Sequence, residues 1–269
     1  MKEFFKKLTA KIRKTLDNTG YTCDVCGEEV FHYPIERLCP SCEEKLQRNH
    51  GNTCEKCGRK TFTEGICLTC KANLPAFTRG FSPFVYRGDT AGLVNRVKNG
   101  TPRLACYFGE RMAEKFAARY KGLPTLSEGE ILLVLPVPMT DARKRERGYN
   151  QAERLAEVVC EKLKEEGISA ELHLEVLQKK RETALQKHMD AQGRRENVSG
   201  AYHVHQRAAC RGKRILLVDD IMTTGATTSE CAERLFGAGA KEVYVLVVAA
   251  LPERKHVERG ENPSKSTNN

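Results

Sequence analysis

Residues 215–227 read Ile-Leu-Leu-Val-Asp-Asp-Ile-Met-Thr-Thr-Gly-Ala-Thr, and this stretch has the pattern of a strand, a turn and the start of a helix. Its first four residues are apolar, which is typical of a strand buried on both faces of a parallel sheet. Two carboxylates end the strand, and the chain then turns into a segment, 228–236, with the pattern of a helix. This order predicts a phosphate site, because the first turn of a helix presents backbone N–H groups that lack intrahelical partners.

The residues of the turn indicate which ligand it could hold. We expect Asp219 and Asp220 to bind the vicinal hydroxyls of a sugar or a Mg²⁺ ion. The next residues supply hydroxyl donors and a small backbone that can approach a phosphate closely: Thr223, Thr224, Gly225, Ala226 and Thr227. Asp pairs also end strands in phospho-receiver and haloacid-type domains, but those lack a Thr-Thr-Gly-Ala-Thr turn directly afterwards. The pattern therefore favours a ligand that combines a phosphate with sugar hydroxyls or a cation.

Helices and strands alternate around this stretch, from residue 77 to 251. The short apolar runs at 131–135 and 243–248 predict two more buried strands. Apolar residues recur every four positions across 104–120, which predicts a helix with one buried stripe, and Asn150 can cap the next helix. The sequence thus predicts an α/β domain with a mostly parallel sheet flanked by helices.

Composition and the chain ends restrict the class of protein. Of the 269 residues, 40% are apolar and 30% charged, enough apolar surface for a buried core. The apolar runs fall short of the roughly 18–20 residues that a membrane span needs, and residues 1–20 lack the apolar region of a secretory signal. We therefore expect no integral membrane segment and a cytoplasmic protein. The basic leader at 1–20 predicts an amphipathic helix that covers the core or binds a membrane surface or partner, and the polar tail at 252–269 predicts disorder.

A cysteine-rich segment at 21–72 precedes the α/β domain. Eight of the twelve cysteines form four Cys-x-x-Cys pairs: Cys23 and Cys26, Cys39 and Cys42, Cys54 and Cys57, and Cys67 and Cys70. In a reducing compartment such pairs indicate metal binding, and two pairs make the tetrahedral sulfur cage that Zn²⁺ prefers. The sequence therefore predicts two zinc sites in a double zinc ribbon. Short spacers favour sequential pairing of the four loops, with cross-braced pairing as the alternative.

The zinc sites have a structural and a functional interpretation. Four thiolates leave Zn²⁺ no open position for substrate, which favours a metal that replaces a hydrophobic core in a segment poor in large apolar residues. A redox or nucleic-acid-reading module is the alternative. The formal net charge of +10 argues little for nucleic acid, because eight thiolates bound to two Zn²⁺ would reduce it.

Residues 219–227 resemble the phosphoribosyl pyrophosphate (PRPP) loop of type I phosphoribosyltransferases. Four further stretches resemble signatures of the ComF family: Leu135 to Pro138, Arg143 to Gln151, Arg181 to Gln186, and Arg194 to Val198. Members of that family also carry a cysteine-rich zinc-ribbon leader, so the resemblance covers most of 21–251. Tyr149 stands where Phe is usual, and an aromatic ring is kept.

The resemblance implies a cytoplasmic phosphoribosyltransferase-like protein, related in fold to amidophosphoribosyltransferase, that is linked to DNA uptake in natural transformation. It makes Asp219 and Asp220 the catalytic residues and the turn the binding site of Mg-PRPP. It assigns Arg143 and Arg147 to a pyrophosphate loop and Arg181 to a mobile loop that closes over substrate. Arginine pairs bidentately with phosphate, which suits both loops to the pyrophosphate of PRPP. The alternative for each loop is a solvated basic surface.

The acceptor of the phosphoribosyl group is left open by the sequence. Enzymes for 6-oxopurines resemble this loop but carry an acidic residue at the position of Thr223, which argues against hypoxanthine or guanine. The alternative function is a non-catalytic accessory of the DNA import machinery, with a vestigial or sensory PRPP site, that binds single-stranded DNA or a competence helicase or ATPase. Single-strand binders use exposed aromatic rings, and this chain has no Trp. The intact loop at 219–227 favours an enzyme.

Overall fold

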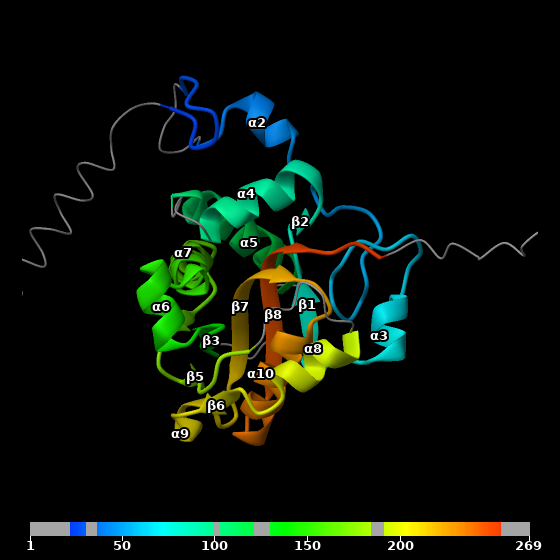
Figure 1. Cartoon of the computed structure of the whole chain (residues 1–269), viewed down its shortest axis with the longest axis vertical. Helices are drawn as coiled ribbons and strands as arrows, with labels where there is room; N and C mark the ends of the chain where they lie inside the picture. Colours follow the sequence, from blue (N-terminus) through cyan, green and yellow to red (C-terminus); the bar gives the residue numbers. More distant parts are fainter. Residues whose placement is uncertain (1–21, 31–36, 99–102, 121–129, 184–190, 254–269) are drawn as a thin grey trace, which may run out of the picture.

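The computed structural model describes residues 22–30, 37–98, 103–120, 130–183 and 191–253. The expected leader helix lies outside these residues, as does most of the polar tail. Among the described residues, no helix is both long and apolar enough to cross a membrane. Figure 1 shows a central sheet with helices on both sides and two small cysteine-rich lobes at its periphery.

The sheet is parallel and has six strands: β1 (Arg79–Phe81), β2 (Phe84–Val85), β3 (Leu132–Pro136), β4 (Ala170–Leu172), β7 (Arg214–Met222) and β8 (Glu242–Ala250). Their order is β1-β8-β7-β3-β4, and β2 also pairs with β8. The three buried strands that the sequence predicted are β3, β7 and β8, and they form the centre of the sheet. The longest two, β7 and β8, pair from Arg214 and Glu242 to Met222 and Ala250, so they end together, whereas β3 ends earlier, where Pro136 pairs with Val218.

The remaining elements flank this sheet. They are the helices α4 (Gly88–Lys98), α5 (Leu104–Tyr120), α6 (Asp141–Arg147), α7 (Gln151–Glu165), α8 (Ala191–Val198), α9 (Arg207–Cys210) and α10 (Ala226–Gly237), with an antiparallel ribbon of β5 (Leu177–Lys179) and β6 (Tyr202–Val204). The α/β fold with a mostly parallel sheet is thus confirmed. The ribbon lies below the sheet in Figure 1, near α9.

Both faces of the sheet are buried, as the continuous apolar strands require. Along β7, Leu216 and Val218 share a core with α5 and α7, whereas Ile215 and Leu217 share a second core with α10. Successive side chains of a strand point to opposite faces, so each run of apolar residues supplies both layers. The sheet is therefore held from both sides, and its strand ends form a rigid base for side chains beyond them.

Local signals set most element ends. The side chain of Asn150 accepts a hydrogen bond from Ala152 N at 3.0 Å and caps α7, as expected. Four of the flanking helices were not expected from the sequence: α4, α6, α8 and α9. α6 begins where the Thr140 hydroxyl accepts from Arg143 N and ends at Gly148, whose φ is 82°. α8 is polar along its length, so it has no apolar stripe by which periodicity could find it.

The cysteine-rich segment packs against the sheet domain in two places. Its first lobe contains α2 (Pro40–Glu44) and shares a core with α4 and α5 through Leu38 and Leu46. Its second lobe contains α3 (Leu68–Ala72) and covers the edge strand β1, where Gly80 N donates to Lys56 O at 2.8 Å. Figure 1 shows α2 above α4, and α3 on the opposite side of the sheet from α6. The division at 21–72 and 77–251 stays a prediction.

Candidate functional site

A cavity of about 470 Å³ opens at the carboxyl ends of β3 and β7. Its lining includes residues from α4, α6, the start of α7, the β5–β6 ribbon and the β7–α10 turn: Lys98, Arg143, Arg147, Gln151, Lys179, Tyr202, Asp219, Asp220 and residues 223–228. Ligands of open α/β sheets bind outside the carboxyl ends of the strands. The sequence-predicted turn therefore lies where this fold binds ligands.

Two carboxylates form the floor of the cavity at the end of β7. Asp220 is only 4% exposed, and its Oδ2 accepts from Lys98 Nζ at 3.0 Å and from Gln151 Nε2 at 3.4 Å. The partly buried Asp219 accepts at Oδ1 from Asp220 N at 2.8 Å. Burial, reinforced by the neighbouring negative charge of Asp220, raises the pKa of Asp219 well above its usual value. The pair is thus poorly compensated and favours a ligand that brings hydroxyl donors or a cation.

The turn between β7 and α10 forms the wall beside this pair. Gly225 has a φ of 82° and is the N-cap of the twelve-residue helix α10. The Thr224 hydroxyl accepts from Ala226 N at 3.4 Å, which holds the turn closed at the start of the helix. A Cβ at Gly225 would meet Met222 Sδ at 3.7 Å, an ordinary contact. The left-handed backbone therefore favours glycine here, and the close approach of a phosphate to this residue stays a prediction.

Two of the three arginines predicted to bind PRPP line the cavity. Arg143 and Arg147 reach it from α6, and Arg147 Nη1 donates to Gln151 Oε1 at 3.1 Å. Arg145 is exposed on the same helix and does not line the cavity. Arg181 donates to Ser199 O at 2.6 Å on the exposed surface and also lies outside the described lining. The structure therefore brings the α6 arginines to the acid pair and leaves Arg181 apart.

Several lining residues were not identified from the sequence. Lys98 is the last residue of α4, a helix that the apolar pattern of the sequence did not predict. Its contact with Asp220 forms only when α4 packs near the end of β7. Lys179 and Tyr202 pair across the β5–β6 ribbon, and Lys179 Nζ lies 5.6 Å from the centre of the Tyr202 ring. Burial lowers the pKa of Lys179. Two of the lining residues did carry a sequence signal: Lys179 begins the basic run that continues with Lys180 and Arg181, and Gln151 ends the stretch from Arg143 that resembles the ComF signature.

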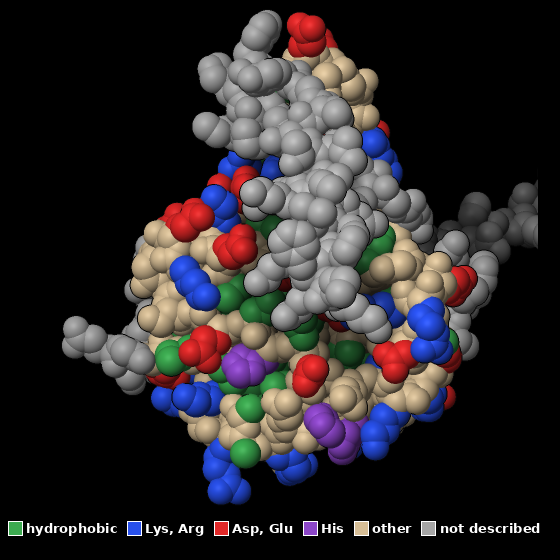
Figure 2. Space-filling model, turned by 90° about the vertical axis from the view of Figure 1, so that its left-hand side faces the viewer, with side chains coloured by type: hydrophobic (Ala, Val, Ile, Leu, Met, Phe, Trp, Pro, Cys, Tyr) green, Lys and Arg blue, Asp and Glu red, His purple; other side chains and the backbone are tan. Residues whose placement is uncertain are grey.

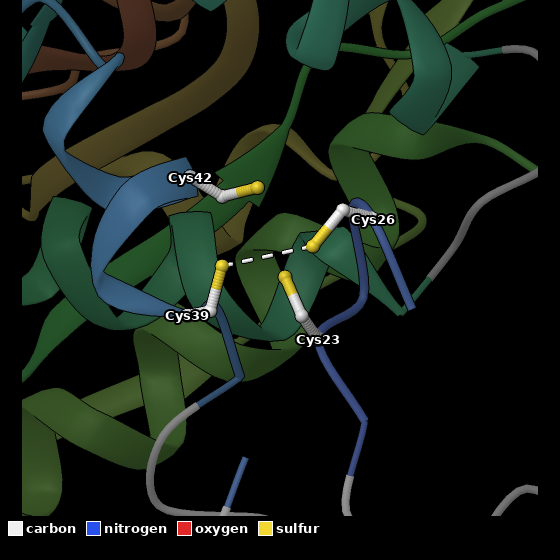
Figure 3. Close-up of side chains that lie close together, drawn as sticks. All are labelled: Cys23, Cys26, Cys39 and Cys42. Carbon is white, nitrogen blue, oxygen red and sulfur yellow. Dashed lines mark hydrogen bonds between the residues drawn. The ribbon is translucent and has the colours of Figure 1, made fainter. Parts of the chain in front are cut away.

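The eight paired cysteines form two clusters in sequential order. One contains Cys23, Cys26, Cys39 and Cys42, and the other contains Cys54, Cys57, Cys67 and Cys70. Within each cluster the sulfur atoms lie within 4.8 Å of one another. Figure 3 shows the first cluster, with its four sulfur atoms turned toward a common centre.

The donor sets of both clusters fit Zn²⁺. Tetrahedral Zn–S bonds of about 2.3 Å place the sulfur atoms about 3.8 Å apart. The observed separations are 3.6 Å for Cys26 and Cys39, and 3.7 Å for Cys57 and Cys67. Backbone N–H groups also point at sulfur, as Cys67 N does to Cys54 Sγ at 3.3 Å. Such donors stabilise thiolates, the form that binds metal, so both groups of four cysteines are able to bind zinc.

Comparison with known families agrees with this geometry. The model of the family described as "Phosphoribosyl transferase domain" matches residues 102–264, which include the acid pair, the turn and α6. The chain belongs to the phosphoribosyl transferase domain family. The cavity at the end of β7 therefore lies within a phosphoribosyltransferase-like domain.

Relatives of this phosphoribosyltransferase-like chain include proteins named for competence and DNA utilization. "DNA utilization protein YhgH" of Salmonella typhi is 26% identical over 226 residues, 83% of this chain and 87% of the relative. "Competence protein ComFC" of Bacillus subtilis is 25% identical over 244 residues, 83% of this chain and 88% of the relative. "Competence protein F" of Haemophilus influenzae is 29% identical, over 42% of this chain and 47% of the relative. Membership of the ComF family is thus confirmed.

Solved phosphoribosyltransferases resemble the chain only distantly. A structure described as hypoxanthine phosphoribosyl transferase of Trypanosoma cruzi is 14% identical, covers 57% of this chain and 68% of its own, and has a TM-score of 0.36. At that distance the comparison adds nothing about substrate.

Proposed function

We propose that the chain binds Mg-PRPP in the cavity at the end of β7 and transfers its phosphoribosyl group to an acceptor with release of pyrophosphate. One observation carries the proposal: an acid pair, a helix N-terminus and two arginines face the same cavity of about 470 Å³. PRPP contains a ribose with two free hydroxyls, a 5′-phosphate and a pyrophosphate. Each of these groups finds complementary chemistry on a different wall.

Different residues of the cavity bind the different groups of PRPP. The turn at 223–227 holds the 5′-phosphate with N–H and hydroxyl donors at the start of α10. Asp219 and Asp220 accept hydrogen bonds from the ribose hydroxyls, which compensates their charge. Arg143 and Arg147 pair with the pyrophosphate across the cavity. Mg²⁺, bound with PRPP, supplies positive charge to the departing pyrophosphate.

The reaction separates charge, and the site suits that task. As the bond from ribose to pyrophosphate breaks, positive charge grows on the sugar while negative charge grows on the leaving group. Asp219 and Asp220 stabilise the positive sugar, and the α6 arginines stabilise the pyrophosphate. Lys98 compensates Asp220 in the ligand-free cavity at 3.0 Å. A ligand that supplies its own donors would release Lys98 toward the pyrophosphate.

The relatives suggest the cellular setting. Because they are named for competence and DNA utilization, we assign the chain to DNA uptake in the cytoplasm, with single-stranded DNA or a helicase or ATPase of the import machinery as candidate partners. On the face in Figure 2, described Lys and Arg side chains lie among Asp and Glu side chains.

The experiment is a thermal-shift titration with PRPP, with and without Mg²⁺. The wild type should gain stability only when both are present. The double variant Asp219→Asn/Asp220→Asn should lose the gain, because it keeps the shape of the pair and removes two charges. The matched control, Glu157→Gln/Glu165→Gln, removes two exposed charges from α7 and should retain it. A gain that survives in the Asn variant would reject the assigned site, and release of pyrophosphate in the presence of candidate acceptors would separate an enzyme from a PRPP sensor.

A further inference from the structure

Arg59 joins the second cysteine cluster to the phosphate turn. It lies between Cys57 and Cys67 in the chain and is only 4% exposed. Its Nε donates to Cys57 Sγ at 3.1 Å, and its Nη2 donates to Thr223 O at 2.8 Å. One guanidinium therefore contacts a metal-ligand candidate and the first residue of the turn, 164 positions later in the chain.

The buried charge of Arg59 fits a thiolate partner. Burial of an unpaired guanidinium is strongly unfavourable, so a buried arginine needs an anion or several acceptors. Cys57 Sγ, 3.1 Å from Nε, is such an acceptor. A third interaction, from Nη1 to Thr69 Oγ1 at 3.3 Å, fixes the plane of the guanidinium. The direction of its Nη2 donor is therefore set by the second lobe.

This contact determines how the turn faces the cavity. A trans peptide is planar, so its C=O and N–H groups point in opposite directions. Thr223 O faces Arg59, which does not line the cavity, and the N–H of Thr224 in the same peptide must point away from Arg59. Because Thr224 itself lines the cavity, this orientation leaves its N–H free of Arg59 and available to a ligand on the cavity side.

The second lobe is a firm base for this contact. Gly58 packs so closely on β1 that a Cβ there would lie 2.3 Å from Gly80 O. Asn49 Nδ2 donates to Gly58 O at 2.8 Å and to Ser82 O at 3.0 Å. Glu253, just beyond β8, accepts from Leu68 N at 2.9 Å. The lobe is thus attached to the sheet at several points, and Arg59 cannot move independently of it.

We infer that Arg59 is a positioning residue that makes the second cysteine cluster, with its metal, part of the 5′-phosphate site. The inference rests on the proposed PRPP function of the turn and assigns the second lobe a role in ligand affinity. Metal in this cluster fixes Cys57 as a thiolate, Cys57 orients Arg59, and Arg59 holds the Thr223 carbonyl away from the ligand. The first cluster has no such contact with the turn among the described residues.

The test measures the affinity of the full zinc-loaded chain for two probes by calorimetry. Ribose 5-phosphate reports on the turn, whereas Mg-pyrophosphate reports on the arginines of α6. Arg59→Met should lower the affinity for ribose 5-phosphate about tenfold, because the backbone donor of the turn is no longer preorganised. The affinity for Mg-pyrophosphate should stay within about twofold of the wild-type value. Arg59→Lys should recover part of the loss. Lys71→Met, which removes an exposed charge from the same lobe, should bind both probes as the wild type does.

A second readout follows from the reciprocity of linked equilibria. Ribose 5-phosphate should slow the release of one of the two zinc ions to a chelator severalfold in the wild type, and this protection should disappear in Arg59→Met. Wild-type affinity for ribose 5-phosphate in Arg59→Met, or an equal loss for both probes, would overturn the inference. If Arg59→Met does not fold, Arg59→Lys takes its place in the test. Wild-type zinc protection and wild-type affinity for ribose 5-phosphate in Arg59→Lys would also overturn the inference. A wild type that binds neither probe would instead reject the proposed function, and the inference with it.

Discussion

Replacement of Lys98 by Met tests how the ligand-free cavity tolerates its acid pair. Lys98 Nζ lies 3.0 Å from Asp220 Oδ2, and the two side chains are 26% and 5% exposed. Coulomb attraction at this distance is about 5.5 kcal/mol for an effective dielectric constant of about 20. Desolvation of both groups offsets much of that energy, so we expect a coupling of about 1–3 kcal/mol. Met keeps the volume of the lysine stem and removes only the charge.

The assay is a double-mutant cycle by chemical denaturation at neutral pH. Lys98→Met should destabilise the protein, since Asp220 is left buried beside Asp219 with one donor fewer. Asp220→Asn in the Lys98→Met background should restore most of the lost free energy of unfolding. The control cycle uses the exposed pair Lys162 and Glu165, for which about 0.5 kcal/mol or less is expected. Equal coupling energies for the two pairs would show that Lys98 does not stabilise the buried Asp220 more than an exposed ion pair does.

Four further outcomes follow from the same structure. The raised pKa of Asp219 means that ionisation of this carboxyl in the folded protein lowers the free energy of unfolding as pH rises above about 4. Asp219→Asn should therefore stabilise the protein at pH 8 and lose this advantage toward pH 4 in unfolding experiments. An advantage of equal size at both pH values would contradict the raised pKa. Gly225→Ala should lower the free energy of unfolding by about 1–2 kcal/mol because φ is 82°, and an unchanged unfolding curve would exclude that backbone requirement. Elemental analysis should find about two zinc ions per chain, against one or none if the clusters are not both metal sites. If single-stranded DNA binds the basic run Lys179 to Arg181, the logarithm of its affinity should fall by about 0.7 per phosphate contact for each unit of log salt concentration. Lys180→Ala/Arg181→Ala should then flatten that slope, and an unchanged slope would place DNA elsewhere.

The central part of the fold could be predicted because its signals are local. The apolar run at 215–218, the carboxylates after it and the glycine turn specify a strand, its end and the next helix within a few residues. Asn150 was identified as a cap for the same reason, since a cap needs only its own side chain and the following backbone. The zinc clusters likewise follow from Cys-x-x-Cys spacing.

The residues that complete the site could not be found in this way because tertiary packing brings them together. Lys98 meets Asp220 only after α4 packs over the sheet, and Arg59 meets Thr223 only after the second lobe covers the edge strand. Arg143 and Arg147 were identified, but their helix was not. Four of the seven residues of α6 are basic and none is buried, so no apolar stripe marks it. Tertiary contacts, rather than propensity, set these positions.

Calorimetric titration of the full zinc-loaded chain with PRPP, in the presence and absence of Mg²⁺, shows directly whether the cavity at the end of β7 binds Mg-PRPP. We expect one PRPP-binding site per chain, which requires Mg²⁺ and is lost in the double variant Asp219→Asn/Asp220→Asn. At a ligand concentration one hundred times the dissociation constant, the same binding should stabilise the fold by about 2.7 kcal/mol. No heat of binding and no stabilisation at millimolar PRPP with Mg²⁺ would contradict the account and leave the accessory role in DNA import as the better interpretation.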